Sequence, residues 1–259
     1  MKVHFAGERE NCGHHLLRAG VRYRLMSFYE VFNRHQVDQV ETLNRFKHVI
    51  IDSGLFTLMF GAKAGAVLDE QFLNEWLNAY VSYINATPFK NAHFVEMDIQ
   101  KKVSPEAAWH YRELMKSRIN KGGLINVYHL EDGNPDRLID YADYIAISIP
   151  ELRAAISDKE RERVTTYIAT RAKRKGKKVH LLGCTEIKYL KKYRFCDTCD
   201  STSWQSAFRY GSQRTQSLGN VSINQIRKQT GGKPDPGNEI YWSALFALQD
   251  YRKHAGSQD

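Results

Sequence analysis

Acidic side chains and one histidine stand at the carboxyl ends of short apolar segments of this sequence. They are Asp52, Asp98, Asp200 and His129, and Glu96 lies inside the segment that ends with Asp98. A charged group beside an apolar segment costs free energy unless it is paired or used. Any single aspartate could simply cap a following helix, but three of them make capping alone a poor explanation. Two carboxylates about 5–5.5 Å apart suit a retaining displacement at a sugar carbon, one as nucleophile and one as general acid and base.

These residues need elements that bring them together, and the sequence predicts an alternation of strands and helices. Predicted strands are the segments 2–6, 48–52, 93–98, 124–129, 144–149, 178–183 and 195–201, and 221–223 could be an eighth. Helical spacing of apolar residues predicts helices over 16–32, 68–84, 105–121, 135–141, 158–175, 186–192 and 239–254. Ser104 followed by Pro105 is typical of a helix start.

This alternation over 259 residues predicts an α/β fold, a (β/α)8 TIM-type barrel that forms a single domain, residues 1–259. A doubly wound open sheet is the alternative, but the segment FAGERENCG after the first strand matches a GxGxxG loop poorly. In a barrel the carboxyl ends of the strands meet at one mouth. The three aspartates and the histidine are therefore expected to converge there.

The chain carries a surplus of positive charge, with a formal net charge of +9. Such a surplus favours a polyanionic partner, nucleic acid first, although a basic enzyme with another substrate is the alternative. Basic residues recur in clusters in the carboxyl-terminal half, among them 161–178, 188–194 and 209–214. The sequence shows neither a membrane-spanning segment nor the apolar core of a signal peptide, so a cytoplasmic protein without membrane contact is expected.

The four cysteines are too few for a disulfide scaffold. Cys184, Cys196 and Cys199, with His180 nearby in the sequence, could supply the ligands of a zinc site. The alternative is that they are small buried residues on adjacent strands. We favour the second interpretation and predict no metal.

Six short motifs occur in an order that resembles the tRNA-guanine transglycosylase superfamily. They are FAG near the amino terminus, IDSGLF over 51–56, MD at 97–98, VYH at 127–129, HLLG over 180–183 and DSTSW over 200–204. IDSGLF is similar to the DSGGF motif of the tRNA enzymes. DSTSW after HLLG looks more like the DNA-guanine transglycosylases of the DpdA type, which phages and their hosts use to insert 7-deazaguanine bases into DNA. The resemblance implies a barrel enzyme, a pentosyltransferase, that needs no cofactor.

The resemblance also implies a role for each matching residue. Asp200 corresponds to the nucleophile that attacks C1′ of the sugar and releases guanine, and Asp52 corresponds to the general acid and base. Asp98 corresponds to the carboxylate that reads the base, and Phe56 to an aromatic side chain that stacks on it. The other positions expected to bind substrate are Ser53, His129, Gly183, Ser203 and Trp204.

Two of these assignments have competitors in the sequence itself. Asp197 precedes Asp200 by three residues and is an alternative nucleophile, but on one strand the two side chains should point to opposite faces. Trp204 could wedge into or stack on a nucleic acid, or it could simply pack in the barrel wall.

Two departures from the tRNA enzymes favour DNA as the substrate. Those enzymes carry a zinc module with a CxCxxC motif, which this sequence lacks, and the chain ends soon after the barrel closes. The expected partners are DNA, as a duplex with a flipped guanine or as a single strand, and a 7-deazaguanine base such as 7-cyano-7-deazaguanine (preQ0). Side chains expected to hold the phosphates are Arg209, Arg214, Lys188, Lys191 and Lys192.

Three other functions stay open at this point. They are a tRNA base exchanger with the same mechanism, a nucleic-acid-binding accessory protein with a degenerate site, and a hydrolytic glycosidase that uses the same carboxylates. The presence of every motif carboxylate argues against a degenerate site. A homodimer or an accessory protein is a further expectation, because no separate DNA-binding module is evident; in a phage-encoded protein the compartment would be the host cytoplasm.

Overall fold

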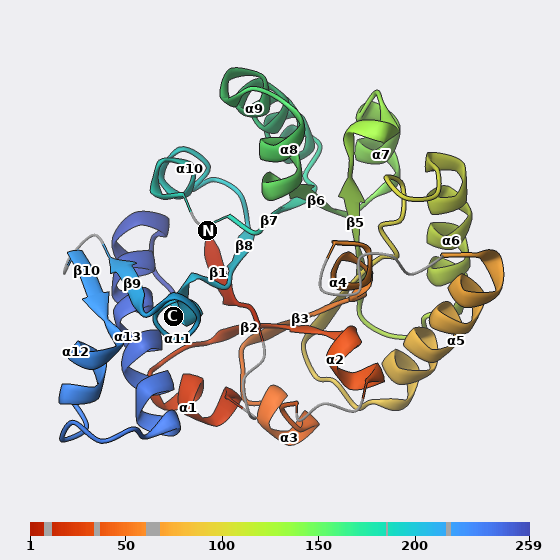
Figure 1. Ribbon diagram of the computed structural model, residues 1–259. Coiled ribbons are helices and arrows are strands. Elements are labelled where there is room, and N and C mark those ends of the chain that lie inside the picture. The colour runs from red at the N-terminus through yellow and green to blue at the C-terminus, as the bar shows by residue number, and fades with distance from the viewer. Residues whose placement is uncertain (8–11, 34–36, 61–67, 185, 216–218) are drawn as a thin grey trace.

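A computed structural model of the chain describes residues 1–7, 12–33, 37–60, 68–184, 186–215 and 219–259. Its centre is a closed barrel in which eight parallel strands follow one another in sequence order (Figure 1). The strands are β1 (Lys2–Phe5), β2 (Tyr23–Ser27), β3 (His48–Asp52), β4 (Ala92–Val95), β5 (Gly123–Tyr128), β6 (Tyr144–Ser148), β7 (Lys178–Leu182) and β8 (Thr198–Ser201). β8 closes on β1, with Lys2 opposite Thr198. The predicted (β/α)8 fold is confirmed and the open sheet is excluded.

Helices follow the strands and cover the outside of the barrel (Figure 1). They are α1 (Gly13–Arg18), α2 (Phe28–Phe32), α3 (Val40–Leu43), α4 (Leu55–Phe60), α5 (Glu70–Ala86), α6 (Pro105–Arg118), η1 (Leu130–Asp132), α7 (Asp136–Tyr141), α8 (Ile149–Ala155), α9 (Asp158–Arg174), α10 (Ile187–Lys192), η2 (Ser203–Gln205), α11 (Ser206–Tyr210), α12 (Ile223–Lys228) and α13 (Pro236–Ala255). As predicted, Ser104 caps α6, since its side chain accepts from the N–H of Ala107. Among the described residues, no helix has both the length and the apolar character of a membrane span.

The strand β2 shows that one prediction was wrong, namely the single helix over 16–32. The prediction failed at Arg24. A charged residue at helical spacing is typical of an exposed helix face, but Arg24 is fully buried. Its guanidinium lies 3.1 Å from the carboxylate of Asp38 and donates to the carbonyl of Phe5 at 2.7 Å. These contacts satisfy the charge inside the fold and let the segment run as a strand.

Other strand boundaries also differ from the prediction, and β8 begins at Thr198 where the prediction began at residue 195. Segment 221–223 is not the eighth barrel strand, because it lies where β10 (Gly219–Ser222) meets α12; β10 pairs only with β9 (Ser212–Thr215) in a hairpin beside α13. β4 ends at Val95, so Glu96 and Asp98 lie in the loop that follows the strand. Residues 8–11 of the FAGERENCG segment lie outside the described residues.

Side chains along each strand alternate between the barrel interior and the helices. On β1, Val3 and Phe5 pack outward into the core shared with the helices, whereas His4 lies inside and contacts the rings of His48 and His180. The same alternation puts every second residue of a strand into the interior. The last residue of a strand therefore lies on the same face as the residue two positions earlier, one layer nearer the carboxyl end of the barrel.

Candidate active site

A cavity of about 480 Å³ lies at the carboxyl ends of the barrel strands. Its volume falls within the roughly 300–1,000 Å³ that small-molecule sites take. Six of the residues predicted from the sequence line it: Asp52, Asp98, Asp200, Phe56, Gly183 and Arg209. The predicted convergence of the three aspartates on one mouth is therefore confirmed.

Asp52 is the last residue of β3, and side chains of α5 fix the backbone on both sides of it. The hydroxyl of Tyr80 donates to the carbonyl of Ile51 at 2.8 Å. The indole of Trp76 donates to the carbonyl of Ser53 at 3.0 Å. Tyr80 and Trp76 are one helical turn apart and both fully buried, so α5 holds this end of β3 rigidly.

The carboxyl group of Asp52 suits proton transfer near neutral pH. Burial raises the pKa of Asp52 to about 7, the charges of Asp98 and Asp200 add to the rise, and the N–H of Gly54, 2.7 Å away, opposes it. Gly54 has a φ of +81°, and a Cβ there would lie 2.5 Å from the backbone nitrogen of Tyr29, so this turn requires glycine. A group with a pKa near 7 both gives and takes protons readily.

Asp200 on β8 has a different environment. Its Oδ1 accepts a hydrogen bond from the N–H of Gly183 at 2.8 Å and lies 3.2 Å from Nε2 of His180. Gly183 has a φ of +59°, and a Cβ there would lie 2.6 Å from Cγ of Pro150, so glycine is needed for this approach. Donors aimed at a carboxylate favour its charged form. Within the described residues, Oδ2 has no hydrogen-bond partner, which leaves it available for attack.

The competing nucleophile, Asp197, lies outside the barrel. Its carboxylate accepts from Nζ of Lys173 on α9 and from the N–H of Val179, both at 2.8 Å. Asp197 and Asp200 therefore point to opposite sides of the barrel wall, as predicted. Asp197 ties α9 to β7 and does not line the cavity.

Asp98 is held from behind by His129, which does not itself line the cavity. Nε2 of His129 lies 3.6 Å from Asp98, and its Nδ1 lies 2.6 Å from Oε2 of Glu151 on α8. Burial alone would lower the pKa of His129, but its contacts with Asp98 and Glu151 outweigh this and raise the pKa to about 10. The ring is therefore a buried imidazolium between two carboxylates. His129 is expected from the sequence to contact the substrate, but in this arrangement its ring is only 3% exposed and lies behind Asp98.

Three other predicted substrate-binding residues lie away from the cavity. Ser53 is fully buried and lies 3.4 Å from Asp98, to which its hydroxyl donates. Ser203 contacts the hydroxyl of Tyr251 at 2.7 Å. Trp204 is fully buried, and its indole donates to the carbonyl of Ala6 at 2.8 Å. Of the two interpretations of Trp204, packing in the barrel wall is the one found.

Glu96, the remaining acidic residue of the motif region, is structural. Its carboxylate accepts two hydrogen bonds of 2.6 Å from the guanidinium of Arg112 and one of 2.8 Å from the N–H of Val127. Both side chains are almost completely buried. The pair fastens α6 to the loop that carries Asp98, and Glu96 takes no part in the cavity.

The basic residues expected to hold phosphates divide into two groups. Arg209 lines the carboxylate cavity, whereas Lys188 and Arg214 line a neighbouring cavity of about 470 Å³. Lys192 pairs with Glu162, and Lys191 is exposed on the same helix, α10. Arg209 is thus the one of the five that lies at the carboxylate site.

In the described part of the chain, the cysteines and His180 do not form the ligand set of a zinc site. Burial raises the pKa of the Cys184, Cys196 and Cys199 thiols, which disfavours the thiolates that zinc needs. Both ring nitrogens of His180 have other partners. The cluster of the described residues with metal-ligand spacing is His129, Glu131 and Glu151, and there His129 is already paired.

Comparison with protein-family models found no match to the chain, and comparison with curated proteins found none either. The barrel is a fold common among enzymes. The geometry of the carboxylate cavity is therefore the basis on which a function can be assigned.

Proposed function

We propose that this chain is a base-exchanging transglycosylase that replaces guanine in DNA by a 7-deazaguanine base. One observation carries the proposal: Asp52 and Asp200 line the same cavity, where burial raises the pKa of Asp52 and the N–H of Gly183 donates to Oδ1 of Asp200. A carboxyl group with a raised pKa beside a second carboxylate is typical of an acid and a nucleophile that work together. The motif resemblance supplies the substrate class.

In the first step, Oδ2 of Asp200 attacks C1′ of the deoxyribose and the bond from C1′ to the base nitrogen breaks. Asp52 gives its proton to the departing guanine, so that guanine leaves as a neutral base. In the second step, the incoming base attacks C1′ and Asp52 takes the proton from its nitrogen, while the ester bond to Asp200 breaks. The protons balance over the cycle, and the two displacements retain the configuration at C1′.

The walls of the cavity suit a guanine-like base. The carboxylate of Asp98 accepts the N–H groups on the base edge, and the imidazolium of His129 behind it offsets the cost of keeping that charge buried. Phe56 lines the cavity and is 45% exposed, and an aromatic ring at this position suits stacking on a base. Guanine and its 7-deaza analogues share the edge that Asp98 reads.

The cavity lies inside the barrel mouth, so a base within a duplex cannot reach it. The target nucleotide has to flip out, which costs a few kcal/mol, or the substrate has to be single-stranded. Arg209 at the cavity and the net charge of +9 favour the approach of the phosphate backbone.

The test is nucleoside mass spectrometry on duplex DNA, single-stranded DNA and tRNA, each incubated with the protein and 7-cyano-7-deazaguanine. We expect the modified deoxynucleoside from DNA. The matched variants are Asp200→Asn and Asp197→Asn, the same chemical change on the inner and outer sides of the barrel wall. Asp200→Asn should abolish exchange and Asp197→Asn should retain it.

Each of the other possible results of this test would support one of the alternative functions instead. Modified nucleoside from tRNA alone would make the chain a tRNA enzyme. Abasic sites formed without an incoming base would make it a glycosidase. Salt-sensitive DNA binding with no base released from any polymer would make it a binding protein.

A further inference from the structure

Below Asp200, the interior of the barrel holds a chain of hydrogen-bonded side chains from three adjacent strands. Tyr144 of β6 contacts Oγ1 of Thr198 on β8 through its hydroxyl. Thr198 Oγ1 lies 2.7 Å from Nδ1 of His180 on β7, and Nε2 of the same ring lies 3.2 Å from Oδ1 of Asp200. Thr198 and Asp200 are two residues apart, so strand alternation puts both on the inner face.

The chemistry of these groups gives the chain one direction. A carboxylate can only accept, so Nε2 of His180 carries the hydrogen and Nδ1 of a neutral ring is the acceptor. Thr198 then donates to Nδ1 and accepts the hydroxyl proton of Tyr144. Burial raises the pKa of Tyr144, so its hydroxyl keeps the proton that it donates. Every donor in the chain thus points toward Asp200.

The surroundings keep this part of the barrel uncharged. The ring of His4 lies 6.1 Å from that of His180, and its pKa is well below the usual value because of burial and the nearby histidines. Burial likewise lowers the pKa of His48 to about 3 and that of His93 to about 4. The titratable groups near His180 include His4, His48, Tyr144 and the carboxyl group of Asp200, and burial favours the neutral forms of the first three.

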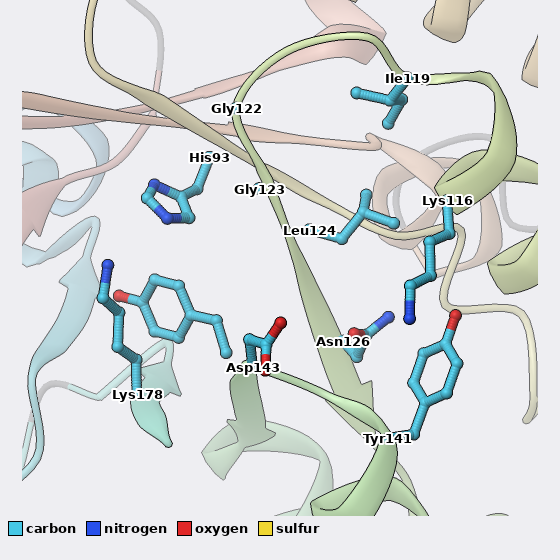
Figure 2. A pocket seen from close by; sticks show the side chains of 11 residues that line it. His93, Lys116, Ile119, Gly122, Gly123, Leu124, Asn126, Tyr141, Asp143 and Lys178 are labelled. Atoms are coloured by element: carbon cyan, nitrogen blue, oxygen red, sulfur yellow. The ribbon is translucent and has the colours of Figure 1, made fainter. Parts of the chain in front are cut away.

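The lower end of the chain reaches the other end of the barrel. Tyr144 lines a cavity of about 220 Å³ at the amino ends of the strands. Figure 2 shows His93 and Lys178 on one side of this cavity and Lys116 with Tyr141 on the other. Interiors of such barrels are usually filled by branched apolar side chains. A buried polar chain is tolerated when every member is satisfied, and here it ends on the nucleophile.

We propose that Tyr144, Thr198 and His180 form a positioning chain that fixes Oδ1 of Asp200, so that Oδ2 is presented to the sugar carbon. This inference rests on the proposed function, since it assigns a role in the same reaction. His180 touches neither base nor sugar, because its ring is fully buried. It acts through Asp200.

Two amide variants of His180 separate positioning from packing. In His180→Gln the amide nitrogen takes the place of Nε2, whereas in His180→Asn it takes the place of Nδ1 and leaves Asp200 without this donor. A hydrogen bond to a charged group corresponds to a rate difference of about tenfold to a hundredfold. We expect kcat/KM for exchange to be lower by that factor in His180→Asn than in His180→Gln, at similar thermal midpoints. Equal rates in the two variants would overturn the proposal.

A second pair tests the link beyond His180. Thr198→Ser keeps the hydroxyl, and Thr198→Val removes it at almost constant shape. We expect the acid limb of the pH profile of kcat/KM to move to higher pH in Thr198→Val and to stay in place in Thr198→Ser. An unmoved limb in Thr198→Val would contradict the chain, and Tyr144→Phe should shift the limb less than Thr198→Val does.

The tautomer of His180 gives a test without activity. Proton–nitrogen correlation NMR, assigned with His180→Gln, should show the hydrogen on Nε2 in the wild type and in Thr198→Ser. A hydrogen on Nδ1 would refute the chain even in an active enzyme. If the wild type exchanges no base, the proposed function fails, whereas an Nε2–H tautomer whose Nδ1 resonance shifts in Thr198→Val would still establish the chain.

Discussion

At the carboxyl end of the barrel, carboxylates face a cavity of about 480 Å³, whereas at the amino end His93 lines one of about 220 Å³ and contacts His48. Burial acts in the same way at both ends, since it disfavours the charged form. It raises the pKa of Asp52 to about 7 and lowers that of His48 to about 3. The two ends differ in the partners that oppose burial.

At the carboxyl end, partners stabilise charge beside the buried groups. There the imidazolium of His129 lies behind Asp98, and the N–H of Gly183 points at Asp200. At the amino end, by contrast, His48 lies between two other neutral rings, His4 at 2.8 Å and His93 at 2.7 Å. Acid and base roles arise where different partners shift the pKa values of neighbouring groups in different directions. Burial alone shifts every group toward its neutral form.

The largest effect is expected from Asp52→Asn, which removes the group with the pKa near 7. Loss of a general acid lowers rates by about 10²–10⁴-fold. In the wild type, kcat/KM should fall as the pH rises through about 7, because in the proposed reaction guanine departs only when Asp52 is protonated. Initial exchange rates between pH 5 and 9 measure both effects. A variant that keeps the same alkaline limb would remove Asp52 from this role.

Breaking the charged pair behind Asp98 should have the next largest effect. Glu151→Gln leaves the buried imidazolium with one carboxylate, and loss of a buried partner costs about 3 kcal/mol of unfolding free energy. Because the pKa of His129 is raised to about 10, its stabilisation is complete below about pH 6.5 and is lost as the pH rises through 10. Urea denaturation at pH 7 and pH 9.5 measures how much unfolding free energy is lost between the two pH values. This loss should be smaller in the variant than in the wild type.

The matched control for this pair is Glu131→Gln, since Glu131 is exposed on the neighbouring turn. We expect its unfolding free energy to stay within about 0.5 kcal/mol of the wild type. A loss equal to that of Glu151→Gln would mean that the effect is not specific to the buried pair.

The histidines of the amino end should make the protein sensitive to acid. The depressed pKa values of His48 and His93 mean that the unfolded chain binds protons below about pH 6.5 while the folded chain does not. Stability is therefore complete above pH 6.5 and is lost toward pH 4 by about 1.4 kcal/mol per pH unit for each ring. His48→Gln should reduce the loss between pH 6.5 and pH 5 by about 2 kcal/mol. Replacement of the exposed His110 by Gln should leave the loss unchanged.

The smallest effect is expected at the rim of the carboxylate cavity. Phe56→Ala removes a stacking ring and should raise KM for the incoming base about tenfold with little change in kcat. Phe195→Ala is a close control, because Phe195 is 46% exposed against 45% for Phe56 but does not line the cavity. Similar KM changes in the two variants would show that stacking at Phe56 is not the cause.

Much of this arrangement could be predicted from the sequence because strand ends are visible in it. Apolar segments that stop at Asp52 and Asp200 identify the mouth of a barrel, and the order of the motifs brings them together. Gly54 and Gly183 both occupy positive φ values where a side chain would collide, so their presence in the motifs follows from local geometry. These features depend on single strands and their next turns.

The remainder depends on partners that are distant in the sequence. β2 was missed because the charge of Arg24 is satisfied by Asp38, a residue outside the strand. The pairing of His129 with Glu151 was missed because an acidic residue in the first turn of α8 is also typical of an ordinary helix start. The role of His180 was missed because its contacts with Thr198 and Asp200 arise only when β7 lies beside β8.

The single carboxylate cavity has a kinetic consequence for the proposed reaction. Asp52, Asp98 and Phe56 surround one space of about 480 Å³, so the departing guanine and the incoming base occupy the same position in turn. Guanine must leave before its replacement enters, which is the order of a ping-pong reaction. Double-reciprocal plots should therefore be parallel, and free guanine should compete directly with the incoming base while the sugar waits as an ester on Asp200.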